Sequence, residues 1–117
     1  MIKLFLLKPN FPDLKINLNG QLYYCPHCAM VEGILPYYPH IRKVIEIIYV
    51  DFKRPRDIII DLLGEENQGC PVLIIANNNN DADSSYFKDY GNYKFLNSAI
   101  LISRYLAERF SIALPHP

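Results

Sequence analysis

The residues of this sequence that are most able to do chemistry are two cysteines separated by two positions. They form the tetrapeptide Cys25-Pro26-His27-Cys28, in which Pro26 suits the first turn of a helix. A helix N-terminus carries unpaired backbone N–H groups and a partial positive charge, and both stabilise a thiolate. The spacing therefore predicts a redox pair in which Cys25 attacks a disulfide and Cys28, one helical turn further on, resolves the mixed disulfide.

His27 lies between these two cysteines. A cationic or hydrogen-bonding imidazole in that position would favour the reduced thiolate and make the disulfide form more oxidising. We therefore interpret His27 as a residue that tunes the cysteine pair and not as a general base.

A third cysteine, Cys70, leaves other interpretations open. Single cysteines often pack as small buried apolar residues, and Cys70 could also serve as a third redox thiol. Alternatively, the three cysteines together with His27 or His40 could form a four-ligand metal site of the zinc type, although the sequence holds no second C-x-x-C pair. Three cysteines are too few, and odd in number, for the disulfide framework of a secreted protein. A catalytic or metal-binding role is therefore favoured over a structural disulfide.

Length and composition predict a single compact domain over residues 1–117, because 50% of the residues are apolar and only 21% are charged. Twelve basic and 12 acidic residues give a formal net charge of zero, which argues against nucleic acid as a partner. The apolar run Leu4–Leu7 is too short for a signal peptide or a membrane span. We therefore expect a cytoplasmic protein without a membrane partner, and no feature specifies an oligomer interface.

Apolar runs and helix boundary signals predict the elements that must position the cysteines. The first strand covers Ile2–Leu7 and is followed by a long loop over residues 8–24. A helix then starts at the cysteine pair and ends near Leu35, before Pro36 and Pro39. The β-branched run Val44–Val50 is typical of a central strand covered on both faces.

The second half of the sequence predicts a helix over residues 57–64 and a strand over Val72–Ile75. A mobile polar loop follows from Asn77 through Asp83 and the adjacent serines. The chain then continues with a strand over Tyr93–Leu96 and a final helix capped by Asn97 or Ser98. This order of elements predicts an α/β fold in which about three helices flank a four-stranded mixed sheet.

The tetrapeptide after a first strand, together with Gly69-Cys70-Pro71-Val72 ahead of the third, resembles the thioredoxin superfamily over nearly the whole chain. Three segments, Phe5–Pro9, Tyr24–Cys28 and Leu63–Gln68, more closely resemble an uncharacterised bacterial family of short thioredoxin-like proteins with a Y-C-P-H-C motif. The resemblance implies a thioredoxin-like fold but no particular substrate.

The resemblance also implies a substrate-binding surface. In the superfamily the proline before the third strand is cis and faces the cysteine pair, and its neighbours bind a peptide or glutathione through the backbone; here these residues are Cys70, Pro71 and Val72. Tyr24 stands where thioredoxins have a tryptophan. In glutaredoxins the helix after the last strand receives the γ-glutamyl end of glutathione, which implies Asn97 and Ser98 here.

We therefore predict a thiol–disulfide oxidoreductase that acts on protein dithiols and disulfides or on a small thiol, with glutathione as a candidate co-substrate and no other cofactor. The alternative is a thioredoxin-fold binding or adaptor module that uses the cleft between Tyr24 and Pro71 without turnover. The sequence also shows a local basic excess, which we interpret as a solvated face, with an anionic ligand as the alternative; it comprises Arg42, Lys43, Lys53, Arg54 and Arg56.

Overall fold

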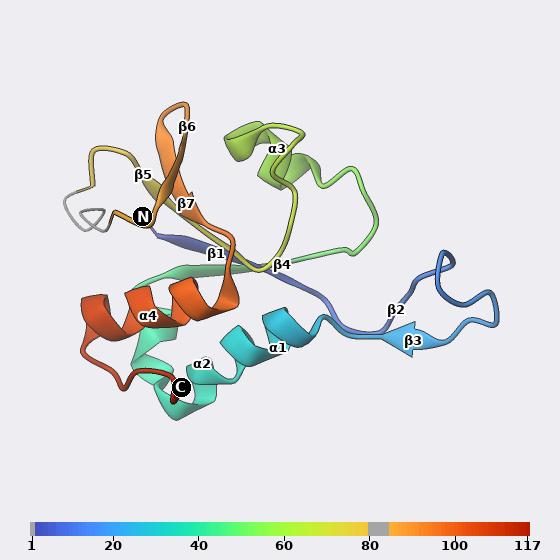
Figure 1. Ribbon diagram of the computed structural model, residues 1–117, viewed down its shortest axis with the longest axis horizontal. Helices are drawn as coiled ribbons and strands as arrows, with labels where there is room; N and C mark the ends of the chain where they lie inside the picture. Colours follow the sequence, from blue (N-terminus) through green and yellow to red (C-terminus); the bar gives the residue numbers. More distant parts are fainter. Residues whose placement is uncertain (1, 80–84) are drawn as a thin grey trace.

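The chain forms a mixed β-sheet with helices on both faces, as shown by a computed structural model that describes residues 2–79 and 85–117 (Figure 1). The strands of the main sheet, in spatial order, are β4 (Glu46–Val50), β1 (Lys3–Leu7), β5 (Val72–Ala76), β7 (Tyr93–Leu96) and β6 (Lys88–Tyr90). The helical segments are α1 (Pro26–Glu32), α2 (Ile34–Tyr37), the 3₁₀ helix η1 (Pro39–Lys43), α3 (Asp57–Leu63) and α4 (Ala99–Phe110).

The sheet combines one parallel pair with three antiparallel pairs. β1 pairs with β4 in parallel, so both strands end at the same edge, where Leu7 lies beside Val50. The N–H of Lys8 continues this ladder by donating to the carbonyl of Val50 at 2.9 Å. β5 runs antiparallel to β1, and β7 runs antiparallel to both β5 and β6. The carboxyl ends of β1 and β4 therefore carry the two chain segments that lead to the cysteines and to the basic loop.

Alternation along the strands divides the core into two layers. Leu4 and Leu6 of β1 pack on the side that holds α1, α2 and α4, whereas Phe5 packs on the side that holds α3. The same alternation places Leu73 of β5 on the first side and Val72 on the second. Figure 1 shows this sandwich, with α3 on one side of the strands and α1 and α4 on the other.

The expected mixed α/β class is confirmed, and the three expected helices are present as α1, α3 and α4. The expected number of strands is wrong, because the sheet has five strands where the sequence predicted four. The additional strand, β6, has three exposed residues, so it carries no apolar pattern. It pairs with β7 through a two-residue turn in which Gly91 has a φ of 55°, a left-handed conformation that glycine adopts freely.

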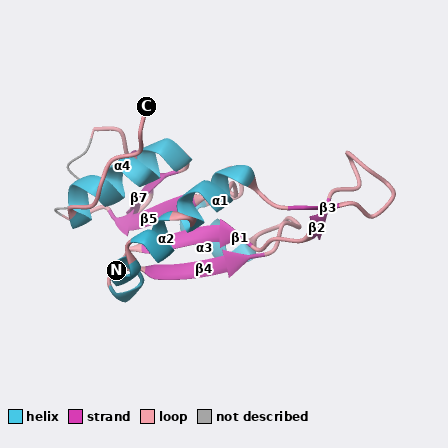
Figure 2. Cartoon of the chain, turned by 90° about the horizontal axis from the view of Figure 1, so that it is seen from below, coloured by secondary structure: helices cyan, strands magenta, loops and turns pink. Residues whose placement is uncertain are grey.

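Two other boundaries also differ from the prediction. The expected loop over residues 8–24 contains a short ladder between β2 (Phe11–Pro12) and β3 (Leu22–Tyr23), and Figure 2 shows this arm standing away from the main sheet. The first helix ends at Glu32, and Pro36 lies inside α2 instead of stopping the helix. Pro36 is tolerated there because the N–H groups of a first helical turn have no intrahelical partner to lose.

The run Val44–Val50 was expected to be a central strand, but β4 begins at Glu46 and lies at the edge of the sheet. Accordingly, Glu46 and Tyr49 are exposed, Ile47 and Ile48 are half buried, and only Val50 is buried. The expected polar loop lies partly outside the described residues, since residues 80–84 are not among them. Within the described ranges, no helix has the length and apolar character needed to cross a bilayer.

A candidate dithiol site at the start of the first helix

Cys25 occupies the N-cap position of α1, immediately before Pro26 at the first helical position. Its backbone is extended, with φ −79° and ψ 115°, as is usual for a capping residue. Its Sγ accepts a hydrogen bond from the backbone N–H of Cys28 at 3.2 Å. The sulfur therefore takes the place of the side-chain oxygen that normally satisfies an unpaired N–H at a helix start, and a negative charge on that sulfur is stabilised by the helix end.

Cys28 differs sharply from Cys25, since it is buried with 4% exposure and belongs to the core beneath α1. Its Sγ accepts a hydrogen bond from the N–H of Leu7 at 3.5 Å. Burial raises the pKa of the Cys28 thiol well above its usual range, and the neighbouring Cys25 adds to this increase. The two thiols are thus asymmetric: Cys25 is partly accessible, and Cys28 lies behind it as a protonated thiol.

Cys70 brings the loop before β5 to the same place. The thiol of Cys25 donates a weak hydrogen bond to the backbone carbonyl of Cys70 at 3.9 Å. The Cys70–Pro71 peptide bond is cis, as expected, and Pro71 and Val72 are buried. Burial raises the pKa of the Cys70 thiol to about 11, although the positive charge of Arg56 opposes this rise. All three cysteines are free thiols in the structure.

Arg56 is a charged residue of the site that the sequence did not reveal. It is buried with 7% exposure, so the interpretation of the basic segment as a solvated face is wrong for this residue. Its guanidinium donates to the backbone carbonyls of Asp51 at 3.2 Å, Phe52 at 2.6 Å and Gln68 at 2.8 Å. These bonds tie the β4–α3 loop to the loop that leads into Cys70.

The Arg56 charge acts on the cysteines because no acidic side chain among the described residues forms an ion pair with it. Burial lowers the pKa of its guanidinium, while the cysteines raise it, with Cys70 having the largest influence among them. Conversely, Arg56 favours the ionised form of Cys70. A buried cation whose hydrogen bonds all go to neutral carbonyls leaves a positive potential that a thiolate can satisfy.

Aromatic contacts hold the arm against this loop. The rings of Phe11 and Phe52 are stacked, with their centroids 4.3 Å apart and an interplanar angle of 4°. The guanidinium carbon of Arg56 lies over the Phe52 ring, 5.8 Å from its centroid. The β2–β3 arm is therefore fastened to the basic loop at its base.

A largely apolar cavity of about 460 Å³ opens beside the cysteine pair, at the carboxyl end of β1. Tyr24, which has 63% exposure, forms part of its wall. Its expected role in contacting a substrate stays a prediction. At its rim the hydroxyl of Tyr49 donates to Glu32 at 2.7 Å. The cavity is lined by Leu6, Leu7, Lys8, Pro9, Tyr24, Cys25, Cys28, Ala29, Glu32 and Tyr49.

Three of the residues predicted for the site have no observed role in binding. His27 is exposed, and its imidazole forms no hydrogen bond or ion pair with any residue that the structure describes, so its tuning role stays a prediction. Ser98 caps α4, since its hydroxyl accepts the N–H of Leu101 at 3.3 Å. Asn97 is exposed on the turn before α4. A ligand role for Asn97 and Ser98 also stays a prediction.

The arrangement does not favour the metal alternative. Among the residues that the structure describes, no group of three or more His, Cys, Asp and Glu side chains could hold a metal ion. Cys28 turns into the core, and His27 stands exposed on the helix start.

The family described as "Protein of unknown function (DUF3088)" has a model that matches residues 2–114, and the chain belongs to that family. No curated protein matches the chain, and no solved structure matches it.

Proposed function

We propose that this protein is a thiol–disulfide oxidoreductase in which Cys25 is the attacking thiol and Cys28 the resolving thiol. The observation that carries the proposal is the position of the Cys25 sulfur, which caps α1 and accepts the Cys28 N–H at 3.2 Å while the Cys28 thiol lies buried behind it. A reactive cysteine needs a stabilised thiolate and access to substrate, and a resolving cysteine needs proximity and protection.

The reaction balances with a substrate disulfide as oxidant. The Cys25 thiolate attacks one substrate sulfur, forming a mixed disulfide and releasing the first substrate thiolate, which takes up a proton from solvent. Cys28 then loses its proton and attacks the Cys25 sulfur, which releases the second substrate thiol. The substrate gains two electrons and the protein becomes a Cys25–Cys28 disulfide, which an external dithiol or two molecules of a small thiol reduce again.

Strand topology supports a thioredoxin-like fold for this chemistry. The sheet places β4 and β1 in parallel, then β5 and β7 antiparallel, with α1 following the first strand of the core and α4 following the last. The order of these elements along the chain is compatible with the resemblance to the thioredoxin superfamily, and β6 is an additional strand at the edge of the sheet. The Cys70 carbonyl beside the Cys25 sulfur offers a backbone acceptor to an extended substrate.

The test measures reduction of a peptide disulfide by the protein, with dithiothreitol as the final reductant, for the wild type and three single variants. We expect Cys25→Ser to abolish turnover. In the absence of dithiothreitol, Cys28→Ser should form the first mixed disulfide and stop there, which intact-mass spectrometry detects. Cys70→Ser should keep turnover and serves as the matched control for loss of a thiol.

Full activity of the Cys25→Ser variant would overturn the proposal. Turnover at background for the wild type, together with a ligand-induced rise in Tm, would instead favour the binding-module alternative, because a ligand that binds only the folded state stabilises it. The cavity beside Tyr24 is the place where such a ligand would bind.

A further inference from the structure

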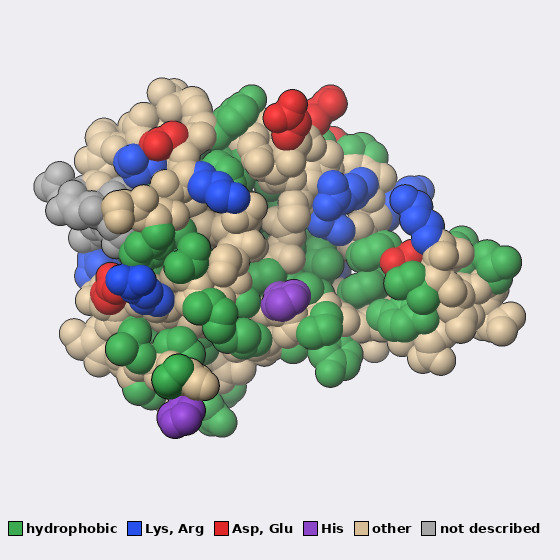
Figure 3. Space-filling model, viewed as in Figure 1, with side chains coloured by type: hydrophobic (Ala, Val, Ile, Leu, Met, Phe, Trp, Pro, Cys, Tyr) green, Lys and Arg blue, Asp and Glu red, His purple; other side chains and the backbone are tan. Residues whose placement is uncertain are grey.

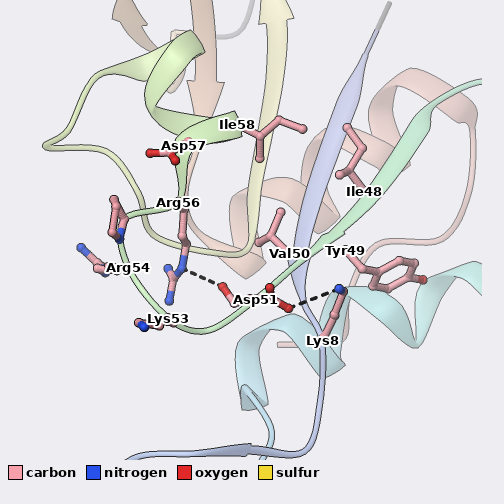
Figure 4. A pocket seen from close by; sticks show the side chains of 11 residues that line it. Lys8, Ile48, Tyr49, Val50, Asp51, Lys53, Arg54, Arg56, Asp57 and Ile58 are labelled. Atoms are coloured by element: carbon pink, nitrogen blue, oxygen red, sulfur yellow. Dashed lines mark hydrogen bonds and ion pairs between the residues drawn. The ribbon is translucent and has the colours of Figure 1, made fainter.

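A second cavity of about 540 Å³ lies at the carboxyl end of β4, on the side of the sheet that faces α3 (Figure 4). Four basic and two acidic side chains contribute to its lining, although the chain as a whole has a formal net charge of zero. The lining consists of Lys8, Ile48, Tyr49, Val50, Asp51, Lys53, Arg54, Pro55, Arg56, Asp57 and Ile58.

The basic side chains differ in how much of their charge is already used. Lys8 pairs with Asp51 at 3.2 Å, and Arg56 gives its hydrogen bonds to backbone carbonyls. Lys53 and Arg54 are exposed and form no ion pair with any described side chain. Figure 4 places Lys53, Arg54 and Arg56 around one end of the cavity. That end therefore presents two available cations above a buried one, which is a favourable setting for an anion.

This charged cavity and the cavity at the dithiol lie on opposite faces of the sheet, since Ile48 and Val50 pack on the side of α3 and Leu6 and Cys28 on the side of α1. The two linings share Lys8 and Tyr49, so both cavities reach the ends of β1 and β4. Figure 3 shows Lys and Arg side chains gathered over the β4–α3 loop on the face that Figure 1 presents. The same charges reach the thiols, since both Arg54 and Arg56 favour the ionised form of Cys70.

We propose that this cavity binds a carboxylate of the substrate, so that the protein prefers disulfides flanked by acidic groups. The proposal rests on the proposed function, because it names the class of disulfide that Cys25 attacks. When a substrate sulfur is bound at Cys25, the adjoining part of the substrate passes Lys8 and Tyr49 at the strand ends. The carboxylate of that part then contacts Lys53 and Arg54. The apolar part of the lining, from Ile48, Val50 and Ile58, packs against the carbon atoms between them.

A carboxylate can come from an acidic peptide segment or from a small acidic disulfide, and the experiment separates these sources. One arm compares three peptide disulfides that differ only in having Glu, Gln or Lys beside the cysteine. The other arm compares 3,3′-dithiodipropionate with its uncharged diamide. The kcat/KM for reduction is measured for each compound at low and at high salt.

The variant for this test carries Lys53→Gln and Arg54→Gln. Its matched control carries Lys43→Gln and Lys88→Gln, which remove the same charge from exposed residues that line neither cavity. We expect the wild type and the control to favour the Glu peptide over the Gln peptide about fivefold at low salt, as two exposed ion pairs would allow. The preference should vanish in the variant and shrink at high salt, because exposed charges are screened.

Equal kcat/KM for the Glu, Gln and Lys peptides in the wild type, or an equal loss of preference in variant and control, would overturn the proposal. A preference limited to dithiodipropionate would assign the site to small molecules. The same peptides with cysteine capped as a thioether test binding by fluorescence anisotropy even if no compound is turned over. If no compound is turned over but the Glu peptide still binds more tightly than the Gln peptide, the proposed function is refuted and the carboxylate site is retained.

Discussion

The starts of α1 and α4 are built in the same way but from different atoms. At each start an extended residue, Cys25 or Ser98, caps the helix by accepting the N–H three positions further on, at 3.2 Å and 3.3 Å respectively. At α4 the acceptor is a hydroxyl oxygen, which is among the best capping groups. At α1 it is sulfur, a weak acceptor as a thiol and a far stronger one as a thiolate.

The electrostatic surroundings of Cys25 also favour a negative charge on its sulfur. The buried Arg56 interacts electrostatically with Cys25, Cys28 and Cys70. Oxygen is the better capping atom, and the sulfur at α1 fits the reactivity that we propose for Cys25. The Ser98 cap, in contrast, stabilises its helix and needs no further role.

The largest effect on stability should come from removing the charge of Arg56, which acts on the cysteines at the start of α1. Arg56→Met keeps much of the side-chain volume but leaves three backbone carbonyls without their donor. We expect a loss of about 3 kcal/mol in the free energy of unfolding, measured by urea denaturation, because buried acceptors lose their partners. The loop before Cys70 also loses its tie to the β4–α3 loop.

Arg54→Met provides the control for this change, since Arg54 is the exposed basic neighbour in the same loop. Its unfolding free energy should stay within about 0.5 kcal/mol of the wild type. Arg56→Lys should fall between the two, because a lysine keeps the charge but cannot reach three carbonyls at once. Equal losses for Arg54→Met and Arg56→Met would contradict the structural role assigned to Arg56.

The next effect is a difference in reactivity among the three thiols. Burial raises the pKa of Cys70 from 9.0 to about 11 and raises that of Cys28 further, so both remain protonated near neutral pH. At pH 8 the thiolate fraction of Cys70 should be about a hundredfold lower than that of a cysteine with an ordinary pKa. Its alkylation rate should therefore keep rising with pH up to about 11.

Iodoacetamide labelling followed by peptide mass spectrometry measures these rates separately. Cys25 should be alkylated first and Cys28 last, the order that a capped, accessible thiol and a buried one require. The urea-unfolded protein is the control, and in it the three rates should converge. Alkylation of Cys70 at pH 8 as fast as that of Cys25 would show that the asymmetry is absent.

Much of the fold was predictable because its signals are local. The apolar runs at Leu4–Leu7 and Val72–Ile75 identify two strands, and the C-x-x-C tetrapeptide marks the start of α1. Because both cysteines lie within one helical turn, their proximity follows from the sequence alone. β6 could not be predicted in this way, since its exposed residues Lys88, Asp89 and Tyr90 owe their strand pairing to β7.

The role of Arg56 could not be predicted, because its partners lie in separate loops. In the sequence it is the last of three basic residues within four positions, a pattern that fits a solvated loop. Only the fold brings Asp51, Phe52 and Gln68 around its guanidinium. Tertiary proximity decided what local patterning left open.

A smaller effect is expected at the oxygen cap. Ser98→Ala should lower the free energy of unfolding by about 1 kcal/mol, because the N–H of Leu101 loses its acceptor in the first turn of α4. Asn97→Ala, at the exposed neighbouring position, should have almost no effect and serves as the control. Thermal unfolding followed by circular dichroism measures both. A loss of turnover in either variant without a loss of stability would instead indicate the ligand role that the sequence suggested.

The smallest effect, and the one that separates capping from chemistry, is the stability of Cys25→Ser. A serine hydroxyl is a better N-cap acceptor than a thiol, so this variant should match the wild type or exceed it by about 0.5 kcal/mol in unfolding free energy at pH 7. The shorter C–O bond limits the gain, and the hydroxyl can still donate toward the Cys70 carbonyl. Cys25→Ala removes the acceptor altogether and should be less stable than Cys25→Ser. A loss above about 1 kcal/mol in Cys25→Ser would mean that the sulfur is held by packing, and the contrast with Ser98 would then be one of size and not of reactivity.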